Sequence, residues 1–194
     1  MKKLNLGCGR FKKEGFINVD VDARTQPEVL HDLNAYPYPF SEAEFGHIEA
    51  DHVLEHLNDP IRTMKELHRI LQPEGTLVVR LPHFSRGFTN PDHKRGFDFT
   101  FAYWFDPKME VWYCGAPYDL KKMRFRWSSQ PYLKKKLFSL PTYAASCVAG
   151  GLIDFFANLS PLLCSRLWCF WVGGFEEMEF VFIKRGGSSP QGRT

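Results

Sequence analysis

Short apolar segments alternate with polar connections along the first 82 residues of the chain. Five of these segments have the length and composition of strands, and they cover residues 3–6, 16–21, 29–32, 47–50 and 76–82. The last one is almost continuously apolar and β-branched, which is typical of a parallel strand covered on both faces. The pattern therefore predicts an α/β protein whose first five strands lie in this half of the chain.

One helix is predicted directly before the last of these strands. Asp59 is a favourable N-cap and Pro60 a favourable first residue, and apolar side chains then recur at helical spacing until the Pro/Gly-containing segment 73–75. An earlier connection is much shorter, because only seven residues separate Gly9 from Ile17. A crossover helix needs a dozen residues or more, so we expect an irregular loop or a single turn there.

The second half of the chain has a different pattern. Residues 109–114 and 122–128 have the composition of strands, and 137–175 is an apolar stretch with only two charged residues, for which we expect helices. Residues 177–184 alternate like a half-buried final strand. The Gly/Ser/Pro-rich segment 186–194 is expected to be a disordered tail.

Composition narrows the class of protein. A chain of 194 residues is long enough for one domain with a sizeable core. Its net charge of +3 gives no bulk attraction for nucleic acid, so no nucleic-acid partner is expected. The five cysteines are odd in number and include no Cys-x-x-Cys pair, which favours a reduced, cytoplasmic setting over a disulfide framework.

The most specific chemical signal lies at the start of the chain. Gly7-Cys8-Gly9 follows an apolar strand, and the next strand ends at Asp20. A Gly-x-Gly turn lets the backbone approach a nucleoside, and an acid at the end of the second strand reaches the ribose hydroxyls. A dinucleotide fingerprint would require glycine at position 12, where this chain has Lys12.

The order of motifs over residues 4–82 resembles that of the class I S-adenosylmethionine-dependent methyltransferases. After Asp20, a third strand ends at Asp32, the segment 50–56 reads Ala-Asp-His-Val-Leu-Glu-His, and a Leu-Gln-Pro-Glu-Gly turn precedes the fifth strand. The resemblance implies that S-adenosylmethionine is the cofactor, with Asp20 at its ribose and Asp32 at its adenine. The residues thereby assigned to cofactor binding are Leu6, Gly7, Cys8, Gly9, Asp20, Val21, Asp32, Leu33, Ala50 and Asp51.

The resemblance also implies the fold: a Rossmann-like, doubly wound, mostly parallel seven-stranded sheet with an antiparallel last strand and a C-terminal helical cap. We expect a single methyltransferase domain over residues 1–185. Its cofactor half is 1–82, its acceptor and cap region 83–175, and its final strand 177–184. The sequence departs from the family pattern at Phe11, where a third glycine is usual, and at Glu74, which replaces the first glycine of Pro-Gly-Gly.

Polar residues that follow the fifth strand are candidates for the chemistry. In an open α/β sheet ligands lie beyond the carboxyl ends of the strands, and His83 stands directly after that edge. We predict His83 as a general base, with His93 as a weaker candidate; the alternative is that His83 caps loop carbonyls. Asp92, Lys94 and Arg95 are predicted to bind the acceptor.

A second motif competes for residues 52–56. His52-Val53-Leu54-Glu55-His56 spells the His-x-x-Glu-His pattern of inverted zincins, in which two histidines on one helical face share zinc. No third ligand is signalled, so we expect no metal, and a zinc hydrolase is retained only as an alternative function.

The apolar stretch around 134–175 has two interpretations. Soluble helices would cap the acceptor site or pair subunits, giving a monomer or homodimer. Alternatively, Lys134-Lys135-Lys136 before an apolar segment is what anionic lipid headgroups attract, which predicts a peripheral membrane contact. The acceptor is left open among a small molecule, a glycan and a lipid-linked molecule, and a catalytically silent binding module is the alternative to an enzyme.

Overall fold

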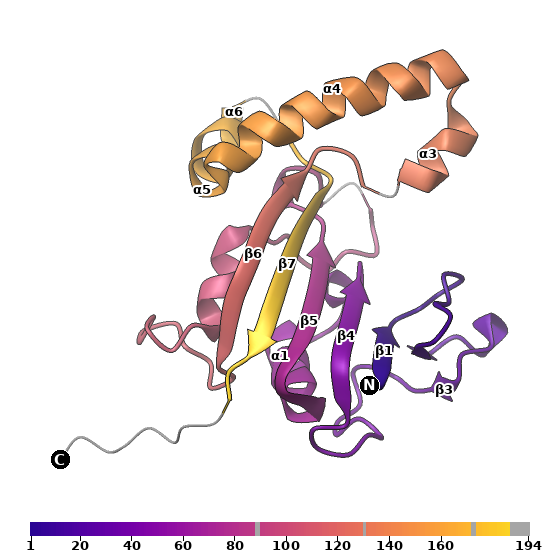
Figure 1. Ribbon diagram of the computed structural model, residues 1–194, viewed down its shortest axis with the longest axis vertical. Coiled ribbons are helices and arrows are strands. Elements are labelled where there is room, and N and C mark those ends of the chain that lie inside the picture. Colours follow the sequence, from indigo (N-terminus) through magenta and orange to yellow (C-terminus); the bar gives the residue numbers. More distant parts are fainter. Residues whose placement is uncertain (88–89, 130, 172–173, 187–194) are drawn as a thin grey trace.

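Seven strands form one mixed sheet in the computed structural model, which describes residues 1–87, 90–129, 131–171 and 174–186. The order across the sheet is β3-β2-β1-β4-β5-β7-β6 (Figure 1). Strand β7 is antiparallel to both of its neighbours, and β1 to β5 are parallel to one another. The strands are β1 (Lys3–Leu6), β2 (Ile17–Asp20), β3 (Val29–Leu30), β4 (Phe45–Asp51), β5 (Leu71–Leu81), β6 (Tyr118–Arg126) and β7 (Glu177–Lys184). The predicted Rossmann-like, mostly parallel seven-stranded sheet with an antiparallel last strand is confirmed.

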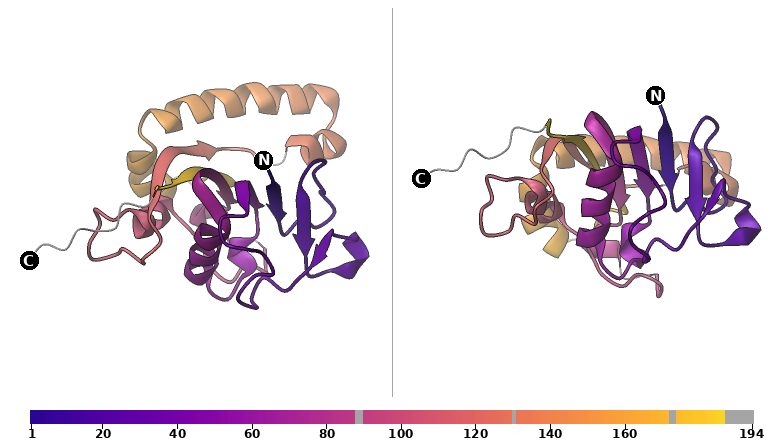
Figure 2. Two further views of the ribbon diagram at one scale, coloured as in Figure 1. Left: turned by 60° about the horizontal axis from the view of Figure 1, so that its bottom comes forward. Right: turned by 90° about the horizontal axis from the view of Figure 1, so that it is seen from below.

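Helices occupy three places relative to this sheet. Helix α1 packs beside β5, the 3₁₀ segment η3 lies near β6, and α3 to α6 lie beyond the carboxyl ends of the parallel strands (Figures 1 and 2). The α-helices are α1 (Pro60–Ile70), α2 (Phe84–Gly87), α3 (Pro131–Leu137), α4 (Leu140–Leu159), α5 (Pro161–Leu163) and α6 (Cys169–Trp171). The 3₁₀ segments are η1 (Ala23–Thr25), η2 (Leu54–His56) and η3 (Phe99–Phe105), and η4 (Cys164–Trp168) is a π-helical segment.

Helix α1 begins as the sequence predicts. The Asp59 side chain accepts a hydrogen bond from the Arg62 backbone N–H at 2.9 Å, and Pro60 occupies the first turn. The helix ends at Ile70 and the chain passes directly into β5, five residues before the predicted start of that strand. Pro73 and Gly75 therefore lie within the irregular beginning of the strand, where Glu74 has a positive φ of 59°.

Only one face of the sheet is covered by a helix in the described part of the chain. Ile48, Leu77 and Phe180 are fully buried in the core. The opposite face of β4, β5 and β7 carries charged residues that include Glu49, Arg80 and Glu179. In Figures 1 and 2, α1 lies on one side of the sheet and α4 lies beyond the carboxyl ends of the parallel strands. On this face of β5, Val78 is buried and Arg80 pairs with carboxylates, so the strand is shielded without a second helix in the described residues.

Ion pairs line the uncovered face instead of a second apolar layer. Arg80 lies between two carboxylates, with Nη1 3.1 Å from Glu49 Oε2 and Nε 2.9 Å from Glu179 Oε2. Lys13, from the loop after β1, reaches Glu49 at 2.8 Å. These partly buried pairs satisfy the polar side chains that alternate with core residues along β4, β5 and β7.

One predicted strand is absent from the described residues, and the predicted tail lies almost wholly outside them. Residues 109–114 form turns rather than a strand, because the backbone N–H groups of Trp112 and Tyr113 both donate to the Met109 carbonyl and close the chain on itself. The predicted tail 186–194 lies outside the described residues except for Gly186. Strands β6 and β7 and the helices between them agree with the expected second half.

Helix α4 is attached to the domain along one side only. The Asn158 amide accepts from the Phe125 backbone N–H at 2.8 Å and donates to the Phe125 carbonyl at 3.0 Å, and Asp154 accepts from the Trp127 N–H at 2.6 Å. The other side of the helix is exposed. The expectation that the apolar stretch folds against its own chain therefore holds for one side of α4 and not for the rest.

Candidate functional site

The Gly-x-Gly turn and Asp20 are brought together as the sequence predicts. Gly7 and Gly9 have positive φ values of 61° and 49°, a region that glycine enters without strain. A Cβ atom on Gly7 would lie 2.5 Å from Val53 Cγ2, whereas none would meet any atom within 4 Å at Gly9. The Gly9 N–H donates to Asp20 Oδ2 at 2.7 Å, and the Asp22 N–H donates to Oδ1 at 2.9 Å.

This arrangement fits the cofactor that the resemblance implies. The Asp20 carboxylate is fixed by two backbone donors at the carboxyl end of β2, and each oxygen keeps a second lone pair for a hydroxyl. Gly9 faces open space beside it. The turn therefore forms a place where a nucleoside can lie against backbone with a carboxylate at its ribose.

The other predicted cofactor residues are distributed around this turn. Asp32 accepts from the Asn34 backbone N–H at 2.9 Å, which holds the pKa of its carboxyl below the usual range. Leu33 and Ala50 are buried in the core. Leu6 and Cys8 are buried next to Gly7, and Val21 is 65% exposed just past β2.

Asp51 lies at the end of β4 with its side chain on the charged face of the sheet. Lys13 Nζ is 2.7 Å from its Oδ2, and Arg80 Nη1 contacts its Oδ1. The side chain is thus part of the ion-pair layer, and only the backbone of residues 50–51 borders the turn at Gly7.

A polar pocket of about 560 Å³ lies beyond the carboxyl ends of β4 and β5. This is the edge at which ligands bind in open α/β sheets. Its lining comes from four separate parts of the chain, and consists of His52, His56, Pro82, Arg86, Asn90, His93, Ser129 and Glu176. Sequence reasoning assigned only His93 among these to the site.

His52, one of the residues that line this pocket, lies between two buried carboxylates. Its Nε2 lies 3.2 Å from Glu177 Oε2 and its Nδ1 lies 3.3 Å from Glu55 Oε1. Burial by itself would lower the pKa of this imidazole, but the two carboxylates raise it to about 9. His52 is therefore a cation at neutral pH. The His-x-x-Glu-His motif already contained His52 and Glu55. Glu177 lies 125 residues further along the chain, so no local pattern could connect it with them.

The structure contradicts the prediction that His83 is a general base. The residue is fully buried, with Nδ1 2.7 Å from Ser85 Oγ and Nε2 3.1 Å from Ser165 Oγ. The Ser85 backbone N–H also donates to Nδ1, so this nitrogen is unprotonated and Nε2 carries the hydrogen. Both ring nitrogens are engaged inside the protein, and His83 joins the end of β5 to the helical cap instead of facing an acceptor.

We expect His83 to make the protein sensitive to acid. Burial lowers its pKa to about 4, with Asp98 acting weakly in the opposite direction. An unfolded histidine titrates near 6.5, so between these values the unfolded state binds more protons and the free energy of unfolding falls as pH falls. At pH 5 the loss due to His83 should be about 2 kcal/mol relative to pH 7.

Chemical denaturation at pH 7 and pH 5 measures this loss. In a His83→Gln variant the difference between the two pH values should be smaller by about 2 kcal/mol. His68, whose pKa burial also lowers to about 4, contributes equally to both proteins and serves as an internal reference. An unchanged pH difference in the variant would contradict the assignment of His83 as a buried neutral histidine.

The loop that carries His93 is held by contacts to the η2 region. The Lys94 backbone N–H donates to the Glu55 carbonyl at 2.9 Å, Lys94 Nζ donates to Asn58 Oδ1 at 2.6 Å, and Arg95 donates to the Asn58 carbonyl at 2.7 Å. Lys94 and Arg95 were predicted to bind the acceptor. In this structure their charged groups are used to fasten the loop, and His93 is the member of the group that lines the pocket.

Asp92 contributes its backbone rather than its carboxylate. The His56 Nδ1–H donates to the Asp92 carbonyl at 3.2 Å. The His-x-x-Glu-His run itself is not one helix, because His52 has a positive φ of 54° and only Leu54–His56 form a 3₁₀ turn. The two histidines of the run therefore do not share one helical face as a zincin pair would.

Comparisons with known proteins agree with the fold. The family model for the methyltransferase domain matches residues 14–79. A search of the curated proteins found no match to the sequence. Three solved structures with a similar fold are 12–17% identical to this chain, and at such identities the likeness shows the fold alone.

Three similar solved structures are methyltransferases. A SAM-dependent methyltransferase from Archaeoglobus fulgidus is 17% identical, with a TM-score of 0.57, and the match covers 94% of this chain and 86% of that one. A putative methyltransferase from Bacillus halodurans is 14% identical, with a TM-score of 0.55 and coverages of 95% and 93%. Phosphoethanolamine N-methyltransferase 2 of Haemonchus contortus, in complex with S-adenosyl-L-methionine, is 12% identical, with a TM-score of 0.55 and coverages of 96% and 50%.

Proposed function

Because residues 14–79 match the model of the methyltransferase domain and the chain has the fold of S-adenosylmethionine-dependent methyltransferases, we propose that it is a class I enzyme of this kind that methylates the polar head of a lipid-linked acceptor at a membrane surface. The observation that carries the proposal is a large exposed apolar surface on the helices beyond the carboxyl edge of the sheet, where the ligand sites lie (Figure 1). An apolar surface of this size on a soluble domain marks an interaction site.

The apolar surface is formed by the exposed side of α4 and the short helices that follow it. Trp171 is 86% exposed and Phe156 66% exposed. The described side chains that make up this surface are Leu137, Phe138, Leu140, Val148, Leu152, Phe155, Phe156, Leu159, Leu162, Leu163, Leu167, Trp168, Phe170 and Trp171. Lys135 and Lys136 are exposed in α3, directly beside it. Apolar and aromatic side chains with adjacent lysines are the composition of an interfacial anchor on anionic lipid.

Helix α4 is long and apolar enough to cross a membrane by length and composition, and 11% of that window is buried. Its contacts favour a helix that lies along the surface. A spanning helix would have to break the bonds of Asp154 and Asn158 to the β6 end and carry both polar groups into hydrocarbon. We therefore propose that α4 lies parallel to the membrane surface.

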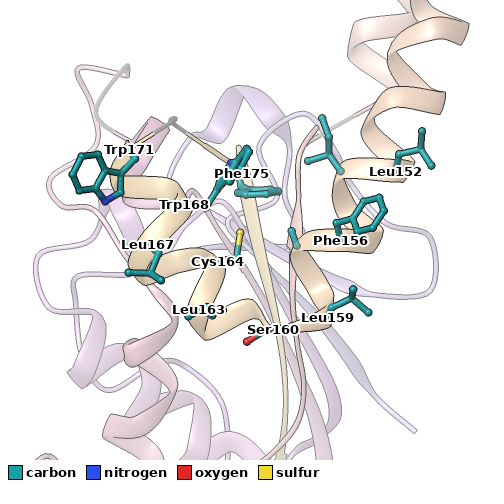
Figure 3. Close-up of a pocket in the computed structure, with 12 residues that line it drawn as sticks. Leu152, Phe156, Leu159, Ser160, Leu163, Cys164, Leu167, Trp168, Trp171 and Phe175 are labelled. Atoms are coloured by element: carbon teal, nitrogen blue, oxygen red, sulfur yellow. The ribbon is translucent and has the colours of Figure 1, made fainter.

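An apolar pocket opens within this surface. It has a volume of about 840 Å³ and lies between α4 on one side and α5–α6 on the other (Figure 3). Phe175 lines this apolar pocket, and the next residue, Glu176, lines the polar pocket with His56 and His93. The linings of the two pockets are therefore adjacent in the chain at residues 175–176. In this proposal an acyl or prenyl chain occupies the apolar pocket and the head group of the same molecule occupies the polar one.

The protein contributes to the reaction mainly by positioning the cofactor and the acceptor. S-adenosylmethionine carries a methyl group already activated on a positively charged sulfur. Gly7 and Gly9 allow the backbone to approach the nucleoside and Asp20 anchors the ribose, while the polar pocket holds the acceptor head. Holding two reactants in line contributes roughly 7–11 kcal/mol to lowering a barrier.

Transfer of labelled methyl from S-adenosylmethionine tests the proposal. The full-length protein is incubated with total lipid extracts and with water-soluble extracts of bacterial and archaeal cells. Label should appear in the organic-soluble product and depend on Asp20. Label confined to the aqueous fraction would overturn the lipid-linked acceptor, and cofactor binding without transfer to either fraction would indicate a silent binding module.

A further inference from the structure

Three ligand-bearing side chains converge at the polar pocket, from two separate segments of the chain. The candidate ligand atoms of Glu55, His56 and His93 all lie within 4.8 Å of one another. His93 Nε2 is 4.0 Å from Glu55 Oε1, and the rings of His56 and His93 meet edge to face with centroids 4.9 Å apart. Two imidazoles and a carboxylate are ligands typical of first-row divalent cations.

The separation is close to what one ion requires. Ligands about 2.1 Å from a tetrahedral ion lie about 3.4 Å from one another. Side-chain rotations that move each ligand atom by about an ångström therefore bring the three groups around a common centre. Such rotation is small for residues on a 3₁₀ turn and a loop.

Glu55 gives an independent sign of a missing partner. Its side chain is fully buried. Oε1 pairs with His52 Nδ1 at 3.3 Å, whereas Oε2 accepts no hydrogen bond from the described residues. A buried carboxylate oxygen without a partner is costly, and a cation between Glu55 and the two histidines would supply one.

The contacts around His56 are those of a metal-binding histidine. The His56 Nδ1–H donates to the Asp92 carbonyl, so Nε2 is the ring nitrogen that can bind an ion. A ligating histidine usually donates its other ring N–H to a carbonyl or carboxylate in this way. The Lys94 backbone N–H holds the Glu55 carbonyl, so the loop of His93 is tied to the turn of Glu55 and His56.

We propose that Glu55, His56 and His93 bind one divalent first-row cation, with its remaining coordination positions open to the polar pocket. The set differs from the zincin pattern in the sequence, because His93 takes the place of His52. His93, predicted as a weaker base, thereby becomes a ligand. An ion here would hold an oxygen of the acceptor head and favour its deprotonated form; this role rests on the proposed function, whereas the binding itself does not.

Spectroscopy with Co²⁺ and equilibrium dialysis with Zn²⁺ test the site on the full-length, metal-stripped protein. We expect one equivalent of metal per chain and visible Co²⁺ absorption. Glu55→Gln and His93→Asn should each weaken binding at least about 10-fold. His31→Asn is the matched control, because His31 is a partly buried histidine that contacts the Ala35 carbonyl and is not among the residues that line the pocket, and it should bind as the parent does.

Two outcomes would overturn the proposal: no binding to the parent protein at millimolar metal, or unchanged binding in both variants. Cofactor binding and circular dichroism verify that each variant is folded, and His93→Asn, on a loop, keeps the test valid if the buried Glu55→Gln variant does not fold. Neither outcome bears on methyl transfer to lipid, which is measured separately.

Discussion

Replacement of Asp20 by alanine is expected to weaken binding of S-adenosylmethionine by about 10–150-fold. A hydrogen bond to a charged group contributes roughly 1.5–3 kcal/mol, which corresponds to that range. In the folded chain the Asp20 carboxylate accepts from Gly9 and Asp22 backbone N–H groups, so it is held in place before the cofactor arrives. Calorimetric titration of the parent and the variant with S-adenosylmethionine measures the change.

Two controls separate a ribose contact from loss of the turn. Asp20→Asn keeps an acceptor for the Gly9 N–H but removes the charge, so it should bind the cofactor between the parent and Asp20→Ala. Asp119→Ala removes the same charge at a distant site, where Asp119 pairs with Arg185, and should bind as the parent does. Parent-like affinity in a folded Asp20→Ala protein would show that the cofactor lies elsewhere.

Binding to anionic vesicles should fall at least about 100-fold when Phe156 and Trp171 are both replaced by serine. Burying one large apolar side chain contributes roughly 1.5–3 kcal/mol, so two contribute at least about 3 kcal/mol. Both residues lie on the exposed apolar surface of α4–α6. Co-sedimentation with vesicles of phosphatidylglycerol and phosphatidylcholine measures the partition coefficient of each protein.

The matched control replaces Val111 and Trp112, which are exposed apolar residues of the 109–114 turns and lie away from this surface. Their replacement by serine should leave vesicle binding unchanged. A Lys135→Gln/Lys136→Gln variant should weaken binding by about 30-fold at low salt, since each lysine near an anionic surface contributes about 1 kcal/mol. That difference should shrink in high salt.

A stable dimer would give the opposite result. If a second copy of the chain covered α4–α6, the parent would elute as a dimer, would not bind vesicles, and would become monomeric on replacement of Phe156 and Trp171. This outcome would overturn the membrane proposal and leave the methyltransferase assignment unchanged.

The sequence by itself determined the elements whose signals are local. The cap of α1 depends on Asp59 and Pro60, and the turn at Gly7-Cys8-Gly9 depends on backbone freedom at two glycines, so both could be predicted from neighbouring residues. The order of these local signals was also enough to predict the sheet and the acid at the end of β2.

Tertiary structure alone decided the roles of the titratable residues. His83 is buried because Ser165, 82 residues away, receives its Nε2–H, and His52 is charged because Glu177, 125 residues away, lies beside it. Likewise, α4 is exposed because β6 binds only one side of it. Burial and charge depend on which distant segments meet, and no local pattern of residues contains that information.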